Sequence, residues 1–216
     1  MDNGLQEMAR DFYGFGRWDA PYWFIGPEPG GEGNESRAKA FLKLNSDGLC
    51  DCREFHKEIG VTQWHREPPE SAALQPTWRR LMLLLLSALG QSTNQIALRR
   101  YQCRDWGMFS SETCVIELGG LSARNLRTSV DRKSFRDRRI EQIRGRLSVS
   151  APRPKVVLMY GMSSKTAWKQ ISGCSLIPGA FERCNQTVFA LMPSPASFGQ
   201  KDEDWIQLGT KIAKQF

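Results

Sequence analysis

The chain is poor in histidine and cysteine and has no long apolar run. Its 216 residues include only 2 histidines and 6 cysteines, and the leucine-rich run LMLLLL at 81–86 is short. A membrane span needs about 18 consecutive apolar residues, so we expect no transmembrane segment. The N-terminus, MDNGLQEMARDF, is mixed and polar and does not resemble a secretory signal. We therefore expect a cytoplasmic protein with no membrane partner.

The cysteines are too sparse for a disulfide scaffold, and we interpret them as reduced thiols. Cys50 and Cys52 form the one close pair. Their C-x-C spacing is uncommon for zinc or iron–sulfur ligands. A metal site built from Cys50, Cys52 and Cys103 stays open as an alternative, but buried, inert thiols fit the pattern better. We expect no metal and no organic cofactor.

The positive charge is concentrated in one stretch. The whole chain carries +7, whereas residues 124–155 alone hold eleven Lys or Arg and three Asp or Glu, an excess of eight positive charges. Such a local excess is typical of a surface that binds a polyanion such as nucleic acid. A solvated helix face is the alternative reading of the same stretch.

Four apolar runs predict strands at 22–26, 113–118, 155–161 and 187–192. They are continuous rather than alternating, which is typical of strands covered on both faces. Helical patterns lie between them, at 35–44, 52–60, 76–90, 134–148, 163–172 and 202–215. Alternating strands and helices predict an α/β fold with a parallel sheet, as one domain over residues 1–216 and a monomer.

Unusual loops follow three of the predicted strands. They read GPEPGGEG from Gly26, GGLSARN from Gly119 and PSPASFG from Pro193. Ligands of parallel sheets bind beyond the carboxyl ends of the strands, so we expect these loops to form one site.

The ordered loops resemble the uracil-DNA glycosylase superfamily. GPEPG at 26–30 is similar to its first motif, G-Q-D-P-Y-H or G-E-A-P-G, and MPSPAS at 192–197 matches H-P-S-P-x-S except at the first place. VVLMYG at 156–161 is similar to its penultimate strand. The resemblance implies a three-layer α/β/α sandwich with a central four-stranded parallel sheet. It also implies an enzyme that flips a base out of DNA and hydrolyses its bond to deoxyribose.

The resemblance assigns roles to several residues. Glu28 takes the place of the catalytic Asp, and a carboxylate there can stabilise an oxocarbenium-like state or steer water. Phe41 corresponds to the phenylalanine that stacks on the flipped base, with a core role as the alternative. Ser194 and Ser197 correspond to residues that grip phosphates, and Phe198 would wedge into the gap left by the base. Arg124, Asn125 and Arg127 lie in the basic stretch and are expected to contact DNA.

Three departures from the family pattern bear on the substrate. Met192 replaces the histidine that stabilises the leaving base, and methionine cannot donate a hydrogen bond. Backbone N–H groups near Gly30, or Arg124 or Asn125, are candidate replacements. Glu117 stands where the family reads uracil with Asn. A carboxylate there suits the amino group of cytosine better, or donates to N3 if it is kept protonated. An ion pair between Glu117 and an arginine of residues 124–146 is the alternative. Gly30 replaces a tyrosine that blocks substituents at C5.

We therefore expect a DNA glycosylase that acts on uracil or, more in keeping with these departures, on a 5-modified pyrimidine. A modified cytosine of phage DNA is one such base, so repair and anti-phage defence both stay open. A binder of modified or abasic DNA without catalysis is the rival interpretation, and Met192 favours it. A domain that binds a phosphorylated small molecule is a third, but neither GGEG nor ELGG fits a known phosphate-binding motif.

Overall fold

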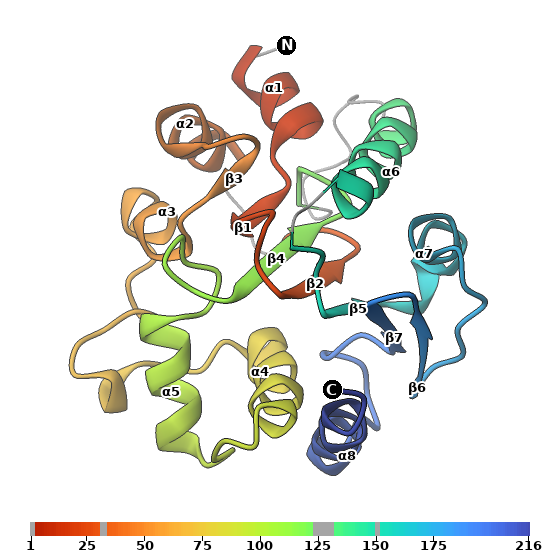
Figure 1. The fold of residues 1–216 in the computed structure, drawn as a ribbon. Helices are drawn as coiled ribbons and strands as arrows, with labels where there is room; N and C mark the ends of the chain where they lie inside the picture. Colours follow the sequence, from red (N-terminus) through yellow and green to blue (C-terminus); the bar gives the residue numbers. More distant parts are fainter. Residues whose placement is uncertain (1–2, 31–33, 123–131, 150–151) are drawn as a thin grey trace.

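The computed structural model describes residues 3–30, 34–122, 132–149 and 152–216 (Figure 1). A seven-stranded sheet runs through the molecule in the order β3-β1-β4-β2-β5-β7-β6. Its strands are β1 (Gly14–Gly16), β2 (Tyr22–Gly26), β3 (Leu49–Cys50), β4 (Thr113–Glu117), β5 (Val156–Tyr160), β6 (Ala180–Cys184) and β7 (Thr187–Met192).

The four central strands, β4, β2, β5 and β7, are mutually parallel. They are the four strands that the apolar runs predict, and their bounds agree within two residues. The outer strands break the pattern, since β1 lies antiparallel to β4 and β6 lies antiparallel to β7. The predicted α/β class is confirmed, but the sheet has seven strands rather than four.

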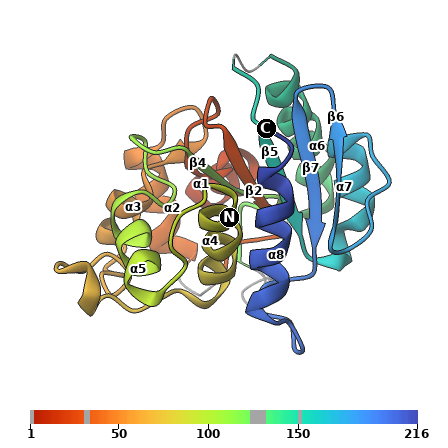
Figure 2. The same ribbon diagram turned by 60° about the horizontal axis from the view of Figure 1, so that its bottom comes forward.

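Helices cover both faces of the sheet (Figures 1 and 2). The α-helices in the described residues are α1 (Asn3–Asp11), α2 (Asn34–Leu44), α3 (Cys52–Glu58), α4 (Pro76–Ala88), α5 (Gln95–Arg104), α6 (Arg132–Val149), α7 (Lys165–Ser172) and α8 (Asp202–Ala213). The 3-10 helices in the part of the chain that the structure describes are η1 (Pro69–Ser71) and η3 (Met162–Ser164). None of the described helices is long and apolar enough to cross a membrane.

Local sequence explains several helix starts. The Asp51 carboxylate accepts the N–H groups of Arg53 and Glu54 at the start of α3, and Asn94 caps α5 in the same way. Pro76 opens α4, where its missing N–H costs nothing, and the Gln75 side chain accepts the N–H of Trp78.

Alternate residues of the central strands serve two cores. Phe24, Val115 and Leu158 belong to the core shared with α4 and α8, whereas Trp23, Ile25 and Met159 belong to the core under α6 and α7. Both sets are buried because a parallel sheet between helix layers has no solvent face, which is why its strands read as continuous apolar runs.

Arg139 of α6 is a charged residue buried in the interior of the protein. Its side chain is 1% exposed, and its guanidinium donates to five backbone carbonyls at 2.5–3.4 Å. Three carbonyls belong to the end of α1 and the residue after it (Ala9, Arg10, Phe12), and two belong to the end of β4 (Glu117, Leu118). The last carbonyls of a helix have no partner within the helix, so Arg139 caps α1 and ties it to the sheet.

Arg139→Met would keep most of the side chain's length and remove all its donors. We expect this change to lower the free energy of unfolding by about 3–5 kcal/mol, because buried carbonyls would lose a charged partner. Urea denaturation followed by circular dichroism measures it. Arg144→Met, exposed on the same helix, is the matched control and should change stability by no more than about 0.5 kcal/mol. Equal losses in the two variants would contradict the capping role.

Candidate functional site

The carboxyl ends of the four central strands lie at one edge of the sheet. Gly26 of β2 pairs with Glu117 of β4, and Tyr160 of β5 pairs with Met192 of β7. Beyond the strand ends, the Leu118 N–H donates to the Gly26 carbonyl at 2.8 Å and the Gly161 N–H to the Met192 carbonyl at 3.1 Å. The three unusual loops therefore start from one edge of the sheet. Among the described residues, the loops after β2 and β4 line one pocket, whereas Pro193 of the third loop lines another, so the single site expected from the sequence stays a prediction.

Two glycines allow close packing at this edge. A Cβ on Gly26 would lie 2.2 Å from the Tyr160 hydroxyl oxygen, and a Cβ on Gly120 would lie 2.4 Å from the Met8 carbonyl oxygen. No real Cβ makes contacts this short, so larger residues would push the first loop away from β5 and the second away from α1.

A pocket of about 70 Å³ opens beside Glu28. Its walls come from the loops after β2 and β4 and from α1 and α6: Ala9, Pro27, Glu28, Leu118, Gly119, Gly120, Leu121, Phe135, Arg136 and Arg139. The pocket combines a carboxylate, two guanidinium groups and an aromatic ring. Glu28 is half-buried, and a Cβ on Gly119 would lie 3.5 Å from its Cβ, so nothing bulky separates the two loops.

Glu117 is buried at the end of β4. Its residue is 7% exposed, and its Oε2 has no hydrogen-bond partner among the described residues. Burial raises the pKa of Glu117 to about 8, and the negative charge of Glu28 adds to the rise, while the positive charges of Arg37 and Arg139 oppose it. Glu117 is therefore mostly a neutral acid at pH 7, with one donor and one acceptor. Arg139, from the basic stretch, donates to the backbone carbonyl of Glu117, and its charge also acts on the Glu117 carboxyl group.

The structure corrects the role expected of Phe41. Its side chain is 1% exposed and packs edge-to-face on Phe12, with ring centroids 5.5 Å apart. It therefore fills the core and offers no face to a base, which is the alternative that the sequence left open. Phe135, on α6, is the aromatic residue that lines the Glu28 pocket. Phe135 lies in the helix predicted at 134–148, but the helical pattern alone could not show that its ring reaches the pocket.

Met192 is also placed differently from the expectation. It is 2% exposed and lines a separate hollow with Pro193, Gln200 and Leu208, not the Glu28 pocket. Its assignment as a base-binding residue is therefore wrong in this structure. Gly30 does have open space around it, since no described atom lies within 4 Å of the place of a Cβ.

The loop after β7 is anchored to α4 and presents a phenylalanine. Arg80 donates to the carbonyls of Pro195 and Gln200, and both Arg79 and Arg80 bind the Asp202 carboxylate. Phe198 is fully exposed, on a loop that extends at the bottom of Figure 2, before α8. Ser194 is half-buried and Ser197 is exposed, and the Ser197 N–H donates to the Ser194 carbonyl in a tight turn.

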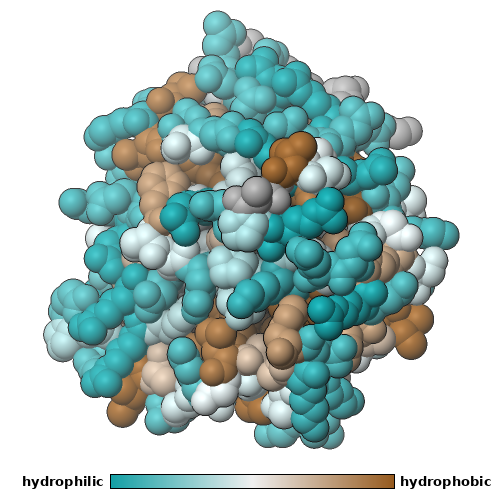
Figure 3. Space-filling view, viewed as in Figure 1, coloured by the Kyte–Doolittle hydropathy of each residue, from teal (hydrophilic) through white to brown (hydrophobic). Residues whose placement is uncertain are grey.

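The basic stretch is divided between surface and core. Arg124, Asn125 and Arg127 lie outside the described residues. Arg136, Arg138 and Arg144 are exposed, whereas Arg139 is buried and unavailable to a partner. The face in Figure 3 is largely hydrophilic, with hydrophobic residues in separate small patches. A polar or charged ligand suits such a face better than an apolar one.

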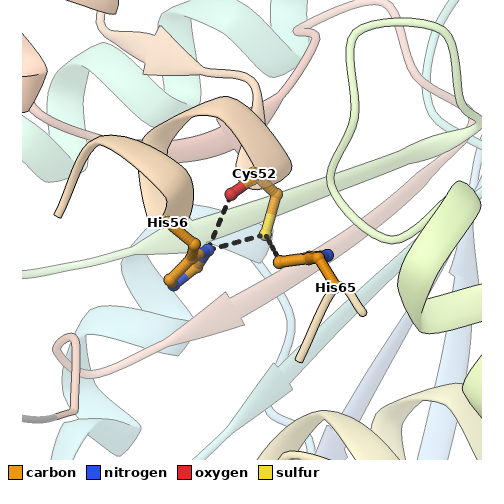
Figure 4. A group of neighbouring side chains, drawn as sticks. All are labelled: Cys52, His56 and His65. Carbon is orange, nitrogen blue, oxygen red and sulfur yellow. Dashed lines mark hydrogen bonds between the residues drawn. The ribbon is translucent and has the colours of Figure 1, made fainter. Parts of the chain in front are cut away.

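Two groups of side chains in the described part of the chain have the composition of metal ligands. One is Cys52, His56 and His65, which point toward one another beneath α3 (Figure 4). The other is Cys174, Glu182 and Cys184, near β6. Neither group contains Cys50 or Cys103, so the cysteine site that the sequence left open is not assembled.

No protein-family model matches the chain, and no curated protein sequence matches it closely enough to indicate a relative.

Ionisation of Glu117 should lower stability as pH rises. Its folded-state pKa of about 8 lies above the ordinary 4.5. The contribution of this carboxyl group to the free energy of unfolding is therefore fully present below about pH 4.5. It declines as the pH rises and is lost above about pH 8. At about 1.4 kcal/mol per pKa unit, wild type should lose a few kcal/mol relative to Glu117→Gln over this window. Urea denaturation of both proteins at several pH values measures the difference. A difference that stays constant between about pH 5 and 9 would contradict it.

Proposed function

We propose that the chain is a DNA glycosylase that flips a pyrimidine-type base out of DNA and hydrolyses its N-glycosidic bond. The observation that carries the proposal is the position of Glu28, directly after β2 and beside a pocket at the carboxyl edge of the sheet. β2 is the first in chain order of the four central parallel strands, and the PSPAS loop follows the last. The order β4-β2-β5-β7 thus supports a uracil-DNA-glycosylase-like sandwich to which β1, β3 and β6 are added.

Glu28 supplies the group that the reaction needs beneath the sugar. As the C1′–N bond breaks, both electrons leave with the base and positive charge develops on the sugar, which a carboxylate stabilises. Water then adds to C1′ and gives up a proton to the carboxylate or to solvent. Pro27 and Pro29 restrict the backbone on both sides of Glu28, so its direction is fixed.

The departing base needs a donor that Met192 cannot provide. Arg136 lines the same pocket as Glu28, and one of its guanidinium nitrogens donates to Ser164 Oγ at 3.0 Å. A guanidinium is always charged and has donors to spare, so it can stabilise negative charge on a leaving base. We assign this role to Arg136 and the stacking role to Phe135.

The substrate we infer is a 5-modified pyrimidine rather than uracil alone. Gly30 is exposed, lies outside the lining of the Glu28 pocket and has open space at the place of a Cβ, so it supplies no ring of the kind that would exclude a 5-substituent. Glu117 is buried and does not itself line the Glu28 pocket, but it directly precedes Leu118, which does. Its neutral carboxyl group carries both a donor and an acceptor, which fits the polar edge of cytosine derivatives as well as that of uracil. Uracil, 5-hydroxymethyluracil and glucosylated hydroxymethylcytosine in oligonucleotides are the substrates to compare, and release of uracil alone would contradict this inference.

Glu28→Gln tests the catalytic assignment. The change keeps the shape of the side chain but removes its charge, so base release should fall by at least about 10²-fold. DNA binding and its steep loss with salt should persist, since they depend on arginines. Abasic-site formation and fluorescence anisotropy measure the two properties. Glu35→Gln, exposed at the start of α2, is the control and should keep full activity; unchanged activity in Glu28→Gln would overturn the assignment.

The rival is a module that binds modified or abasic DNA without cutting it. The observation that favours it is Met192 itself, which cannot donate a hydrogen bond to a leaving base and is buried outside the Glu28 pocket. Wild-type protein that binds these oligonucleotides but yields no abasic site from any of them would favour the rival over the enzyme.

Phe198→Ala tests the wedge. Phe198 is fully exposed and buries nothing in the free protein, so stability should not change. Activity on a paired duplex should fall by roughly tenfold or more, because flipping a stacked, paired base costs a few kcal/mol. Activity on single strands should change less. Ile96→Ala, another exposed apolar residue on the distant α5, is the control; equal losses on duplex and single strand would contradict a wedge.

A further inference from the structure

The group Cys52, His56 and His65 lies apart from the Glu28 pocket and has no part in the proposed chemistry. Cys52 and His56 are one helical turn apart on α3, and both point inward, at 0% and 2% exposure. His65 comes from the segment between α3 and η1 and is half-buried (Figure 4). From this juxtaposition we propose that Cys52, His56 and His65 bind a zinc-class divalent cation.

The distances between the three ligand atoms fit a tetrahedral ion. Cys52 Sγ lies 3.5 Å from His56 Nδ1 and 3.9 Å from His65 Nε2. Zinc bonds of about 2.3 Å to sulfur and about 2.0–2.1 Å to nitrogen place the two atoms roughly 3.6 Å apart in a tetrahedron. All the ligand atoms lie within 4.8 Å of one another. The sulfur would move by a few tenths of an ångström and the two imidazole nitrogens would approach each other somewhat more. The three side chains would then provide three of the four tetrahedral ligands.

The chemistry of the ligands suits zinc. Thiolate and neutral imidazole are its usual ligands, and three protein ligands leave a fourth position for water. His65 is half-buried, so water can reach that position. The ligand atom of His65 is Nε2, the ring nitrogen that faces Cys52 Sγ.

Binding replaces one existing hydrogen bond with a metal bond and removes one proton. His56 Nδ1 lies 2.7 Å from the Cys52 carbonyl oxygen, and this contact is given up when the nitrogen binds the ion. The Cys52 thiol loses its proton to solvent, and the resulting thiolate, with the Asp51 carboxylate one residue earlier, balances the cation. Arg37 and Arg53 also lie near the group, so we expect weaker binding than in zinc-finger peptides.

The ion would cross-link α3 to the segment 59–75. This segment contains only η1 as regular structure, and its main anchor is Gln102, whose amide donates to the carbonyls of Trp64 and Ala73 at 2.8 Å. Aromatic rings surround His56, with Phe15, Trp64 and Trp78 at centroid distances of 5.1–5.3 Å. A site enclosed by aromatic rings favours a structural role over a catalytic one.

Titration of the metal-stripped full chain with Co²⁺, in a phosphine reductant, tests the site. A Cys184→Ser background removes the second metal-ligand group. We expect one equivalent of Co²⁺ to produce the thiolate-to-metal charge-transfer band and strong tetrahedral d–d bands, and Zn²⁺ to displace it. Zn²⁺ at about a hundredfold excess over its dissociation constant should raise the unfolding midpoint by roughly 5–10 °C.

Variants in the same background distinguish this site from others. Cys52→Ser should abolish the charge-transfer band, whereas Cys50→Ser, a buried thiol two residues away, should retain it. His65→Gln, at the most exposed ligand, should fold normally by circular dichroism and weaken Co²⁺ binding at least about tenfold. No band at one equivalent, or a band that survives both Cys52→Ser and His65→Gln, would overturn the proposal. These readouts are independent of glycosylase activity.

Discussion

The site depends on the hydrogen bonds that the buried guanidinium of Arg139 donates to backbone carbonyls. They join the carbonyls at the end of α1 to those at the end of β4, two segments about a hundred residues apart in the chain. The chain continues from β4 into Leu118–Leu121, which forms one wall of the Glu28 pocket. The shape of the pocket is therefore set by a cation whose bonds all go to the backbone.

Among the described residues, the hydrogen bonds of this guanidinium go to backbone carbonyls rather than to a carboxylate. The end of a helix carries partial negative charge on its unpaired carbonyls, and the Tyr13 ring lies 4.3 Å from the guanidinium carbon and adds a cation–π contact. Five donors in a fixed fork match five carbonyls, which the three donors of lysine could not do. The same basic stretch therefore contains residues of two kinds, and charge counting alone could not separate Arg139 from the exposed Arg136 and Arg138.

The sequence predicted the parts of the fold that depend on continuous burial. The four central strands and six of the helices follow from apolar runs and turn residues, whereas β1 and β3 have three and two residues and β6 is half-exposed. α1 and α5 were missed as well. Glu28 could be placed beside the pocket by its loop, because the prolines on both sides restrict the backbone, whereas Gly30 of the same loop does not line the pocket. The sequence could not show which of Phe41 and Phe135 lines the pocket, since both lie on helices and only packing decides which ring faces the core. His65 lies near Cys52 and His56 through a tertiary contact of the irregular segment between α3 and η1. No local sequence pattern predicts such a contact.

Glu117 connects the stability of the sheet to the proposed recognition of a base. Burial keeps this acid protonated, and the same proton provides the donor that an ionised carboxylate lacks. Under the proposed function, raising the pH above about 8 would therefore weaken the fold and change the edge that Glu117 presents from donor and acceptor to acceptor alone. An asparagine at this place would present both groups at any pH without that cost. Under the proposed function, the edge that Glu117 presents to a base therefore depends on surroundings dry enough to keep its carboxyl group protonated.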